Sequence, residues 1–211
     1  MSVFLFPVPR KHSLENHKID FHTTRWIHID PSMSSVIKHH AHKLSDTLST
    51  YFEQPLSLVA GEPKKNSTFL SIALENSDAP PQGYMITIND DGITLRGSDE
   101  PGIFYGLQTL QQLIMQTGTY VPAGVIEDYP DFPSRGFMLD ISRCKVPSMD
   151  SLRKLIDMLA AFKINQLQLY MEHTFAFSAH REVWHDASPM TAEEIVELDS
   201  LCKQRFIELV P

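Results

Sequence analysis

The chain has 211 residues, of which 42% are hydrophobic and 21% are charged, so it can form a packed core. This composition excludes collagen-like, low-complexity and disordered chains. The 18 Lys and Arg residues against 26 Asp and Glu residues give a net charge of −8. Because sequence-independent binding of nucleic acid draws on clustered cations, we expect no nucleic-acid partner.

The apolar segments of the chain indicate whether it spans a membrane or carries a signal peptide. No apolar run approaches the ~20 residues that span a bilayer, so no integral membrane protein is expected. Residues 1–10 are apolar but short, lack a leading basic region and contain two prolines, which is a poor match to a signal peptide. A cytoplasmic location is the default expectation. Cys144 and Cys202 are too few and too far apart for a disulfide framework, and we expect reduced thiols.

Residues 1–128 predict an α+β domain in which a sheet is covered by helices. Strand patterns occupy residues 26–29, 70–74 and 84–88, and the turn residues 89–92 join the last of these to a further strand as a β-hairpin. Residues 34–52 and 102–114 have helical periodicity. The apolar faces of these two helices comprise Val36, Ile37, Ala41, Leu44, Leu48 and Tyr51 in the first, and Phe104, Leu107, Leu110 and Ile114 in the second.

After the proline-containing segment 128–133 the pattern alternates between strands and helices. Strands are predicted at residues 136–142, 165–172 and 206–210. The helix after the first strand carries Leu152, Leu155, Ile156 and Leu159, and the helix after the second opens on a capping box, Thr191 to Glu194, ahead of Ile195, Leu198 and Cys202. Strands joined by such crossovers lie parallel.

These two regions give predicted domains at 1–128 and 129–211. The second has 83 residues, whereas a complete (β/α)₈ barrel takes about 250. We therefore predict an incomplete (β/α)₈ barrel with the first three strands only, and a chain that is a piece of a longer protein. An unpaired barrel edge favours self-association.

Two segments resemble family 20 glycoside hydrolases, the β-N-acetylhexosaminidases. Residues 127–143 read Glu-Asp-Tyr-Pro-Asp-Phe-Pro-Ser-Arg-Gly-Phe-Met-Leu-Asp-Ile-Ser-Arg, and with residues 162–170 they resemble the start of that family's catalytic barrel. Residues 83–95 and 102–110 resemble the α+β domain that precedes the barrel. The two signatures occur in the expected order.

The resemblance implies removal of a terminal, non-reducing β-linked N-acetylhexosamine from a glycan. In the implied substrate-assisted reaction, the acetamido oxygen of the sugar attacks the anomeric carbon. The family's catalytic Asp-Glu pair follows the fourth barrel strand. We therefore expect no catalytic residue within residues 1–211 and no activity from this fragment alone. No cofactor is implied.

The resemblance also implies three sugar-binding residues. Arg143 stands where the family uses an arginine to hold sugar hydroxyls, and its five fixed donors suit that role. Many members carry two consecutive aspartates after the second strand, whereas this chain has Glu172 and His173, which could supply the same polar lining. The alternative readings are a surface ion pair for Arg143 and solvated side chains for the other two. Asp140 is expected to make a structural hydrogen bond in the barrel floor.

Other histidines favour ordinary solvated positions. His39 and His42 lie three residues apart on a predicted helix, but no third ligand stands at zinc spacing. His173, His180 and His185 have loop spacing that is common by chance, so no metal is expected. Two other functions stay open: a barrel glycosidase of different specificity, and a non-catalytic carbohydrate-binding or interaction module.

Overall fold

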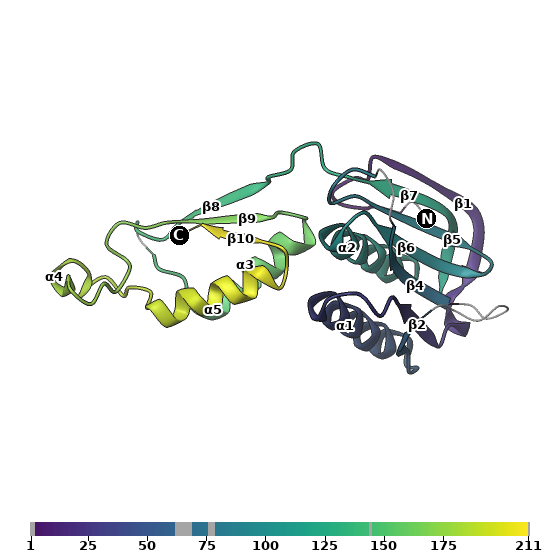
Figure 1. Ribbon diagram of the computed structural model, residues 1–211, viewed down its shortest axis with the longest axis horizontal. Coiled ribbons are helices and arrows are strands. Elements are labelled where there is room, and N and C mark those ends of the chain that lie inside the picture. The colour runs from purple at the N-terminus through teal and green to yellow at the C-terminus, as the bar shows by residue number, and fades with distance from the viewer. Residues whose placement is uncertain (1–2, 62–68, 76–78, 144, 211) are drawn as a thin grey trace. The chain divides into compact units, whose positions relative to one another are not determined.

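The computed structural model describes residues 3–61, 69–75, 79–143 and 145–210 (Figure 1). It divides into two compact units, Met1–Pro133 and Ser134–Pro211. Across the described ranges, no helix combines the length and apolar character needed to cross a membrane. Cys202 is buried and free of any disulfide, and Cys144 lies outside the described residues.

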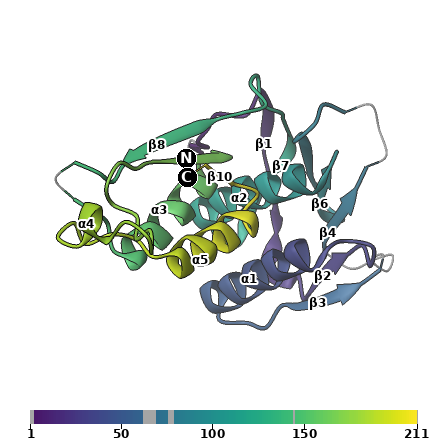
Figure 2. The same ribbon diagram turned by 60° about the vertical axis from the view of Figure 1, so that its left-hand side comes forward.

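The first unit is a seven-stranded mixed sheet with two long helices on one face (Figures 1 and 2). The strand order is β1-β7-β5-β6-β4-β2-β3. β1, β7, β5 and β6 pair antiparallel, whereas β6, β4, β2 and β3 pair parallel. The elements are β1 Lys11–Asp20, the 3₁₀ helix η1 Phe21–Thr23, β2 Trp26–Ile29, α1 Ser35–Phe52, β3 Ser57–Ala60, β4 Phe69–Leu74, β5 Tyr84–Asn89, β6 Gly92–Gly97, α2 Glu100–Thr117 and β7 Tyr120–Asp128.

The predicted helices and the predicted hairpin of the first unit are confirmed. Ser34 caps α1 and Asp99 caps α2, each through its side-chain oxygen. The β5–β6 turn ends at Gly92, whose φ of 138° favours glycine. One detail of the α1 face is wrong: Phe52 is buried, whereas the predicted Tyr51 is exposed. The Phe52 ring lies 5.9 Å from the buried Phe21 ring, centre to centre.

Close packing of α2 on the sheet fixes the core of the first unit. Gly106 lies directly over the sheet, where an added Cβ would come within 2.3 Å of a Leu95 methyl carbon and 3.2 Å of the Tyr84 ring. The core is formed by side chains that are at most 1% exposed, including Phe21, Ile27, Ile37, Leu48, Leu70, Ile72, Ile86, Ile93, Leu95 and Phe104. Their burial supplies the main favourable term in folding.

The second unit is a three-stranded parallel sheet of order β10-β9-β8 with two main helices on one face (Figure 1). Its elements are β8 Gly136–Asp140, α3 Met149–Ala161, β9 Gln166–Tyr170, α4 Arg181–Trp184, α5 Ala192–Lys203 and β10 Glu208–Val210. The predicted capping box at Thr191 and Glu194 is present. The short α4 was not predicted.

Three predicted strand limits in the second unit are wrong by two residues. β9 ends at Tyr170 rather than at residue 172, because the Glu172 N–H donates to Ser142 Oγ instead of to a neighbouring strand. β8 ends at Asp140 rather than at residue 142, because the Asp140 side chain accepts the backbone N–H groups of Ser142 and Arg143 and turns the chain. β10 begins at Glu208 rather than at residue 206, because Phe206 has a φ of 55°, which is incompatible with a strand.

The two faces of this parallel sheet differ in character. Leu167 and Leu169 of β9 are buried, together with Leu152, Ile156 and Leu159 of α3 and with Leu198 and Cys202 of α5. Met138 and Gln168, which pair with each other across β8 and β9, are exposed and project from the opposite face. At the carboxyl end, Asp140 and Tyr170 pair on this same face.

Residues 129–133 lie within the first compact unit, whereas the sequence-based boundary stands at 128/129. Arg10 Nε donates to the Tyr129 carbonyl oxygen at 2.9 Å, and its guanidinium carbon lies 4.1 Å from the centre of the Tyr129 ring. Gln82 Nε2 donates to the Pro133 carbonyl oxygen at 3.0 Å. These contacts hold the segment after β7 to the first unit.

Candidate functional site

Arg143 lies in the loop that follows β8, three residues after the strand ends. Asp140 Oδ1 accepts the backbone N–H of Ser142 at 2.9 Å and that of Arg143 at 3.1 Å. Asp140 Oδ2 accepts from Arg143 Nη1 at 2.6 Å. Asp140 therefore fixes both the turn and one side of the guanidinium. Asp140 makes structural hydrogen bonds as predicted, but among the described residues its carboxylate bonds go to the loop at the carboxyl end of β8 rather than into a barrel floor.

The neighbouring strand β9 supplies the other side of the guanidinium. Arg143 Nη2 donates to Glu172 Oε1 at 3.0 Å and lies 3.4 Å from the Tyr170 hydroxyl oxygen. The Tyr170 hydroxyl donates to the same Glu172 oxygen at 2.7 Å. The guanidinium carbon lies 4.9 Å from the centre of the Tyr170 ring, a cation–π distance. We call Asp140, Arg143, Tyr170 and Glu172 the strand-end cluster.

A buried serine joins the two loops that carry this cluster. Ser142 is 8% exposed, and its Oγ accepts the backbone N–H of Glu172 at 2.6 Å. The same oxygen lies 3.4 Å from the Tyr170 carbonyl oxygen and 3.3 Å from Thr174 Oγ1. Because Thr174 is also buried, these bonds lie beneath the cluster and set the position of the β9 loop against the β8 loop.

The charged ends of the cluster are open to solvent. The side chain of Arg143 is 60% exposed, that of Glu172 48% and that of Asp140 33%. The pKa of the Asp140 carboxyl is lowered, first by the hydrogen bond from the Arg143 side chain and then by that from Ser142 N–H. The pKa of Arg143 is raised, chiefly by its hydrogen bond to Asp140. One fixed cation beside two acceptors can bind neutral, hydroxyl-rich ligands through donors and acceptors together.

The structure brings together two of the three predicted sugar-binding residues. Arg143 and Glu172 are in direct contact. His173 is exposed, and its ring has no hydrogen-bond or ion-pair partner among the described side chains. Sequence reasoning missed Tyr170 and gave Asp140 another place. The available signal was that Asp140 and Tyr170 each lie two residues before the end of a predicted strand, 136–142 and 165–172.

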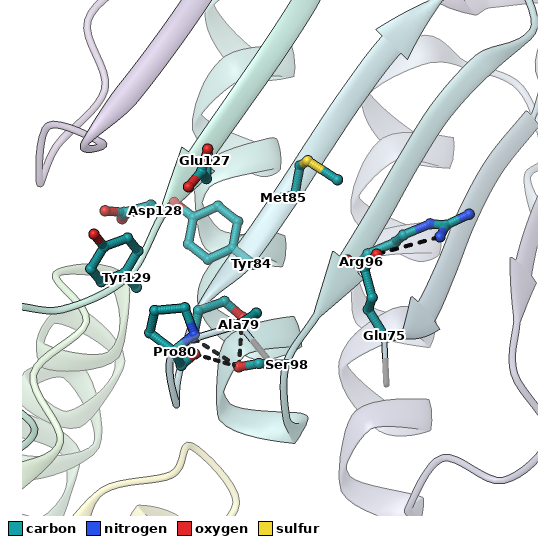
Figure 3. A pocket seen from close by; sticks show the side chains of 11 residues that line it. Glu75, Ala79, Pro80, Tyr84, Met85, Arg96, Ser98, Glu127, Asp128 and Tyr129 are labelled. Atoms are coloured by element: carbon teal, nitrogen blue, oxygen red, sulfur yellow. Dashed lines mark hydrogen bonds and ion pairs between the residues drawn. The ribbon is translucent and has the colours of Figure 1, made fainter. Parts of the chain in front are cut away.

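Metal binding finds no support in the described ranges, where no group of three or more His, Cys, Asp or Glu side chains could hold an ion. A separate pocket of about 180 Å³ lies in the first unit at one end of β5, β6 and β7 (Figure 3). Its charged groups serve the fold: Arg96 pairs with Glu75 at 3.7 Å, and Asp128 accepts from the buried Tyr84 hydroxyl at 3.1 Å. Other lining residues are Ala79, Pro80, Gly83, Met85, Ser98, Glu127 and Tyr129.

Curated relatives of this chain include β-hexosaminidases. It is 32% identical over 149 residues to the beta-hexosaminidase of Akkermansia muciniphila, an alignment that covers 61% of this chain and 30% of that protein. It is 25% identical to a Porphyromonas gingivalis beta-hexosaminidase, with 100% of this chain and 30% of that protein covered. The chain thus spans about a third of the length of these relatives.

Solved structures agree in fold. A chitobiase from Flavobacterium johnsoniae superposes with a TM-score of 0.79 at 25% identity, covering 98% of this chain and 34% of that chain. A mutant Streptomyces plicatus beta-hexosaminidase in complex with its product GlcNAc superposes with a TM-score of 0.77 at 22% identity, covering 98% and 45%.

Family models match both units. The model for glycosyl hydrolase family 20, domain 2, matches residues 2–129, and the model for the catalytic domain of the same family matches residues 132–186. The first match alone covers more than half of the chain. The chain belongs to glycosyl hydrolase family 20.

Proposed function

We propose that this chain is the amino-terminal part of a β-N-acetylhexosaminidase that removes terminal, non-reducing N-acetylhexosamine from glycans. The strand-end cluster is the observation that carries the proposal. It places a protonated guanidinium and a carboxylate side by side, 3.0 Å apart, where two parallel strands end. The similarity to beta-hexosaminidases from two bacteria supports the same substrate class.

In this proposal the second unit contributes the first three strands of a (β/α)₈ barrel. Strands and helices alternate along this unit, and β8, β9 and β10 pair in parallel, which supports this assignment. Active sites of such barrels lie at the carboxyl ends of the strands. Arg143 follows β8 and Glu172 follows β9 at that end. The exposed face with Met138 and Gln168 then lines the barrel interior.

We assign Arg143, Glu172 and His173 to substrate binding. Arg143 donates to sugar hydroxyls, while Glu172 accepts from them, so that adjacent hydroxyls meet one group of each kind. His173 follows Glu172 directly and is exposed, so it can reach a ligand bound above the loop. Holding the ring in one orientation lowers the entropic part of the barrier.

The proposed chemistry is substrate-assisted. The acetamido oxygen forms a bond to the anomeric carbon as the glycosidic bond breaks, and a general acid protonates the leaving oxygen. Water then opens the cyclic intermediate with retention. We place the acid and the carboxylate that orients the acetamido group outside this chain. Asp99 and Glu100 are adjacent but do not form this pair, because Asp99 caps α2 and Glu100 accepts the Ser34 N–H at 2.7 Å.

Hydrolysis by the whole protein tests this function. We expect release of 4-nitrophenol from its N-acetyl-β-glucosaminide and not from the matching β-glucoside, which lacks the attacking acetamido group. Equal turnover of both would favour a barrel glycosidase of another specificity. Turnover of neither, with binding of N-acetylglucosamine retained, would favour a carbohydrate-binding module. Residues 1–211 alone are expected to be inactive, and turnover by this fragment would contradict the placing of the catalytic pair.

The isolated fragment is also expected to self-associate through the edges of its parallel sheet. β8 and β10 each pair with β9 on one side only within the described residues. Unpaired strand edges are templates for association. Light scattering on residues 1–211 should report an oligomer, and a monomer with a cooperative melt would contradict this expectation.

A further inference from the structure

Tyr170 contacts both members of the proposed sugar-binding pair. Its ring faces the Arg143 guanidinium at 4.9 Å, and its hydroxyl donates to Glu172 Oε1 at 2.7 Å. We propose that Tyr170 is a positioning residue, which holds Arg143 and Glu172 in the geometry that binds the sugar. This inference rests on the proposed function, since it assigns a second role at the same site.

An exposed ion pair needs such support. Arg143 and Glu172 have side chains that are 60% and 48% exposed. Exposed pairs of this kind contribute little by themselves, because two long side chains lose rotamer freedom to hold one geometry. The Tyr170 ring restricts the plane of the guanidinium, and its hydroxyl restricts the carboxylate. Both restrictions are made before a ligand arrives, which is what preorganisation requires.

Tyr170 can do this because its own position is fixed. It is the last residue of β9 and is partly buried. Its carbonyl oxygen accepts the Ile141 N–H at 3.1 Å, and it pairs with Asp140 across the two strands. Asp140 in turn holds Arg143 Nη1 at 2.6 Å. The guanidinium is thus held by Asp140 from its own loop and by Tyr170 from the neighbouring strand.

The strand-end cluster leaves one hydrogen-bond donor and one acceptor available to a ligand. Glu172 Oε1 receives both Arg143 Nη2 and the Tyr170 hydroxyl, whereas Oε2 has no partner among the described residues. Arg143 Nε likewise makes no hydrogen bond within the described part of the chain. A donor next to an acceptor matches two neighbouring hydroxyls of one sugar ring. Without the Tyr170 hydroxyl, Glu172 is free to rotate and this match is lost.

Replacing Tyr170 by Phe in the whole protein tests the inference. The variant keeps the ring over Arg143 and removes only the hydroxyl, so we expect the melting temperature to stay unchanged. The KM for 4-nitrophenyl N-acetyl-β-glucosaminide should rise about threefold to tenfold, the size of one ordinary hydrogen bond. The matched control is Tyr51→Phe, which removes an exposed hydroxyl of the first unit that donates to the Met115 carbonyl oxygen; its KM should be unchanged.

A double-mutant cycle then shows whether Tyr170 acts through Glu172. We expect Tyr170→Phe to raise KM in the native background and to have no further effect in a Glu172→Ala background, because Ala leaves the Tyr170 hydroxyl without its carboxylate acceptor. The same rise in both backgrounds, or a Tyr170→Phe variant with native KM, would overturn the inference. A lowered melting temperature with native KM would show a merely structural role.

The Arg143→Ala variant distinguishes a failure of the positioning role of Tyr170 from a failure of the proposed function. If Arg143→Ala impairs turnover and Tyr170→Phe does not, the site is correct and the positioning role is wrong. If Arg143→Ala leaves turnover unchanged, the cluster is not the sugar site and the proposed function loses its main support.

Discussion

Two tyrosine–carboxylate pairs, one in each unit, show how burial changes the use of the same chemical groups. In the first unit, Tyr84 is 5% exposed, and its hydroxyl contacts Thr109 Oγ1 at 2.7 Å and Asp128 Oδ2 at 3.1 Å. Burial raises the pKa of Tyr84 well above its usual value, so the phenol stays neutral. In the second unit, Tyr170 and Glu172 both contact the Arg143 guanidinium, and the Arg143 and Glu172 side chains are exposed to solvent.

Two arginines of the second unit, Arg143 and Arg153, each pair with two carboxylates and allow a similar comparison. Arg153 on α3 pairs with Asp150 at 2.6 Å and with Glu197 of α5 at 2.5 Å. Arg143 has the same pairing with two carboxylates but stands at the carboxyl ends of strands. Position relative to the strands, rather than ion pairing itself, therefore distinguishes the candidate site.

The largest expected effect is on catalysis by the whole protein. Arg143→Ala should lower kcat/KM for the chromogenic N-acetylglucosaminide about 100-fold, the typical cost of losing one well-placed donor. The melting temperature should change little, because the side chain is exposed. Arg153→Ala is the matched control, and its kcat/KM should stay within about threefold of the native value. Equal losses of kcat/KM in the two variants would remove the distinction between Arg143 and Arg153.

The next effect is on the packing of the first unit. Gly106→Val should lower the free energy of unfolding by about 1–3 kcal/mol, because its side chain has no room against Leu95 and Tyr84. Met115→Val, on the exposed side of the same helix, serves as the control and should lower the free energy of unfolding by less than about 1 kcal/mol. Urea unfolding measures both variants. A loss for Met115→Val as large as that for Gly106→Val would contradict the described packing of α2.

A smaller effect is expected from the buried tyrosine. Tyr84→Phe should lower the free energy of unfolding by about 1–2 kcal/mol, because Thr109 and Asp128 lose a hydrogen-bond partner inside the protein. Tyr170→Phe should change it by less than about 0.5 kcal/mol, as is usual for surface changes. If urea unfolding gave the reverse order, the assignment of one tyrosine to the fold and the other to the site would fail.

The smallest effect concerns pH. His28 is 7% exposed, its Nδ1 has no partner among the described residues, and burial lowers its pKa below 6.5. The unfolded chain therefore binds more protons, so stability is fully present above pH 6.5 and is lost as pH falls towards the lower folded pKa. Unfolding midpoints of His28→Leu should depend less on pH between 7.5 and 5 than those of the native protein. An unchanged dependence would exclude His28 as its source.

Sequence patterns predicted those elements whose side chains alternate between the core and solvent. α1, α2, α3 and α5 have clear helical periodicity, and β5 and β6 have clear alternation around a turn. β1 was missed because Lys11–Asp20 is an edge strand with only Ile19 buried, so its sequence carries almost no apolar signal. β3 was missed because its four residues are exposed or only partly buried.

The candidate site was predictable only in part. Arg143 and Glu172 were identified from the family resemblance and from their places near strand ends. The role of Asp140 depends on a turn that stops β8 two residues earlier than predicted. The role of Tyr170 depends on the register of β8 and β9, which pairs it with Asp140. Such contacts between strands cannot be derived from the spacing of residues along one strand.

A crystal structure of the whole protein with bound N-acetylglucosamine tests the central claim most directly. We predict that Arg143 nitrogen atoms and Glu172 Oε2 lie at hydrogen-bond distance, about 2.7–3.2 Å, from hydroxyl groups of the sugar. A sugar bound elsewhere, with Arg143 still occupied only by Asp140, Glu172 and Tyr170, would contradict the claim.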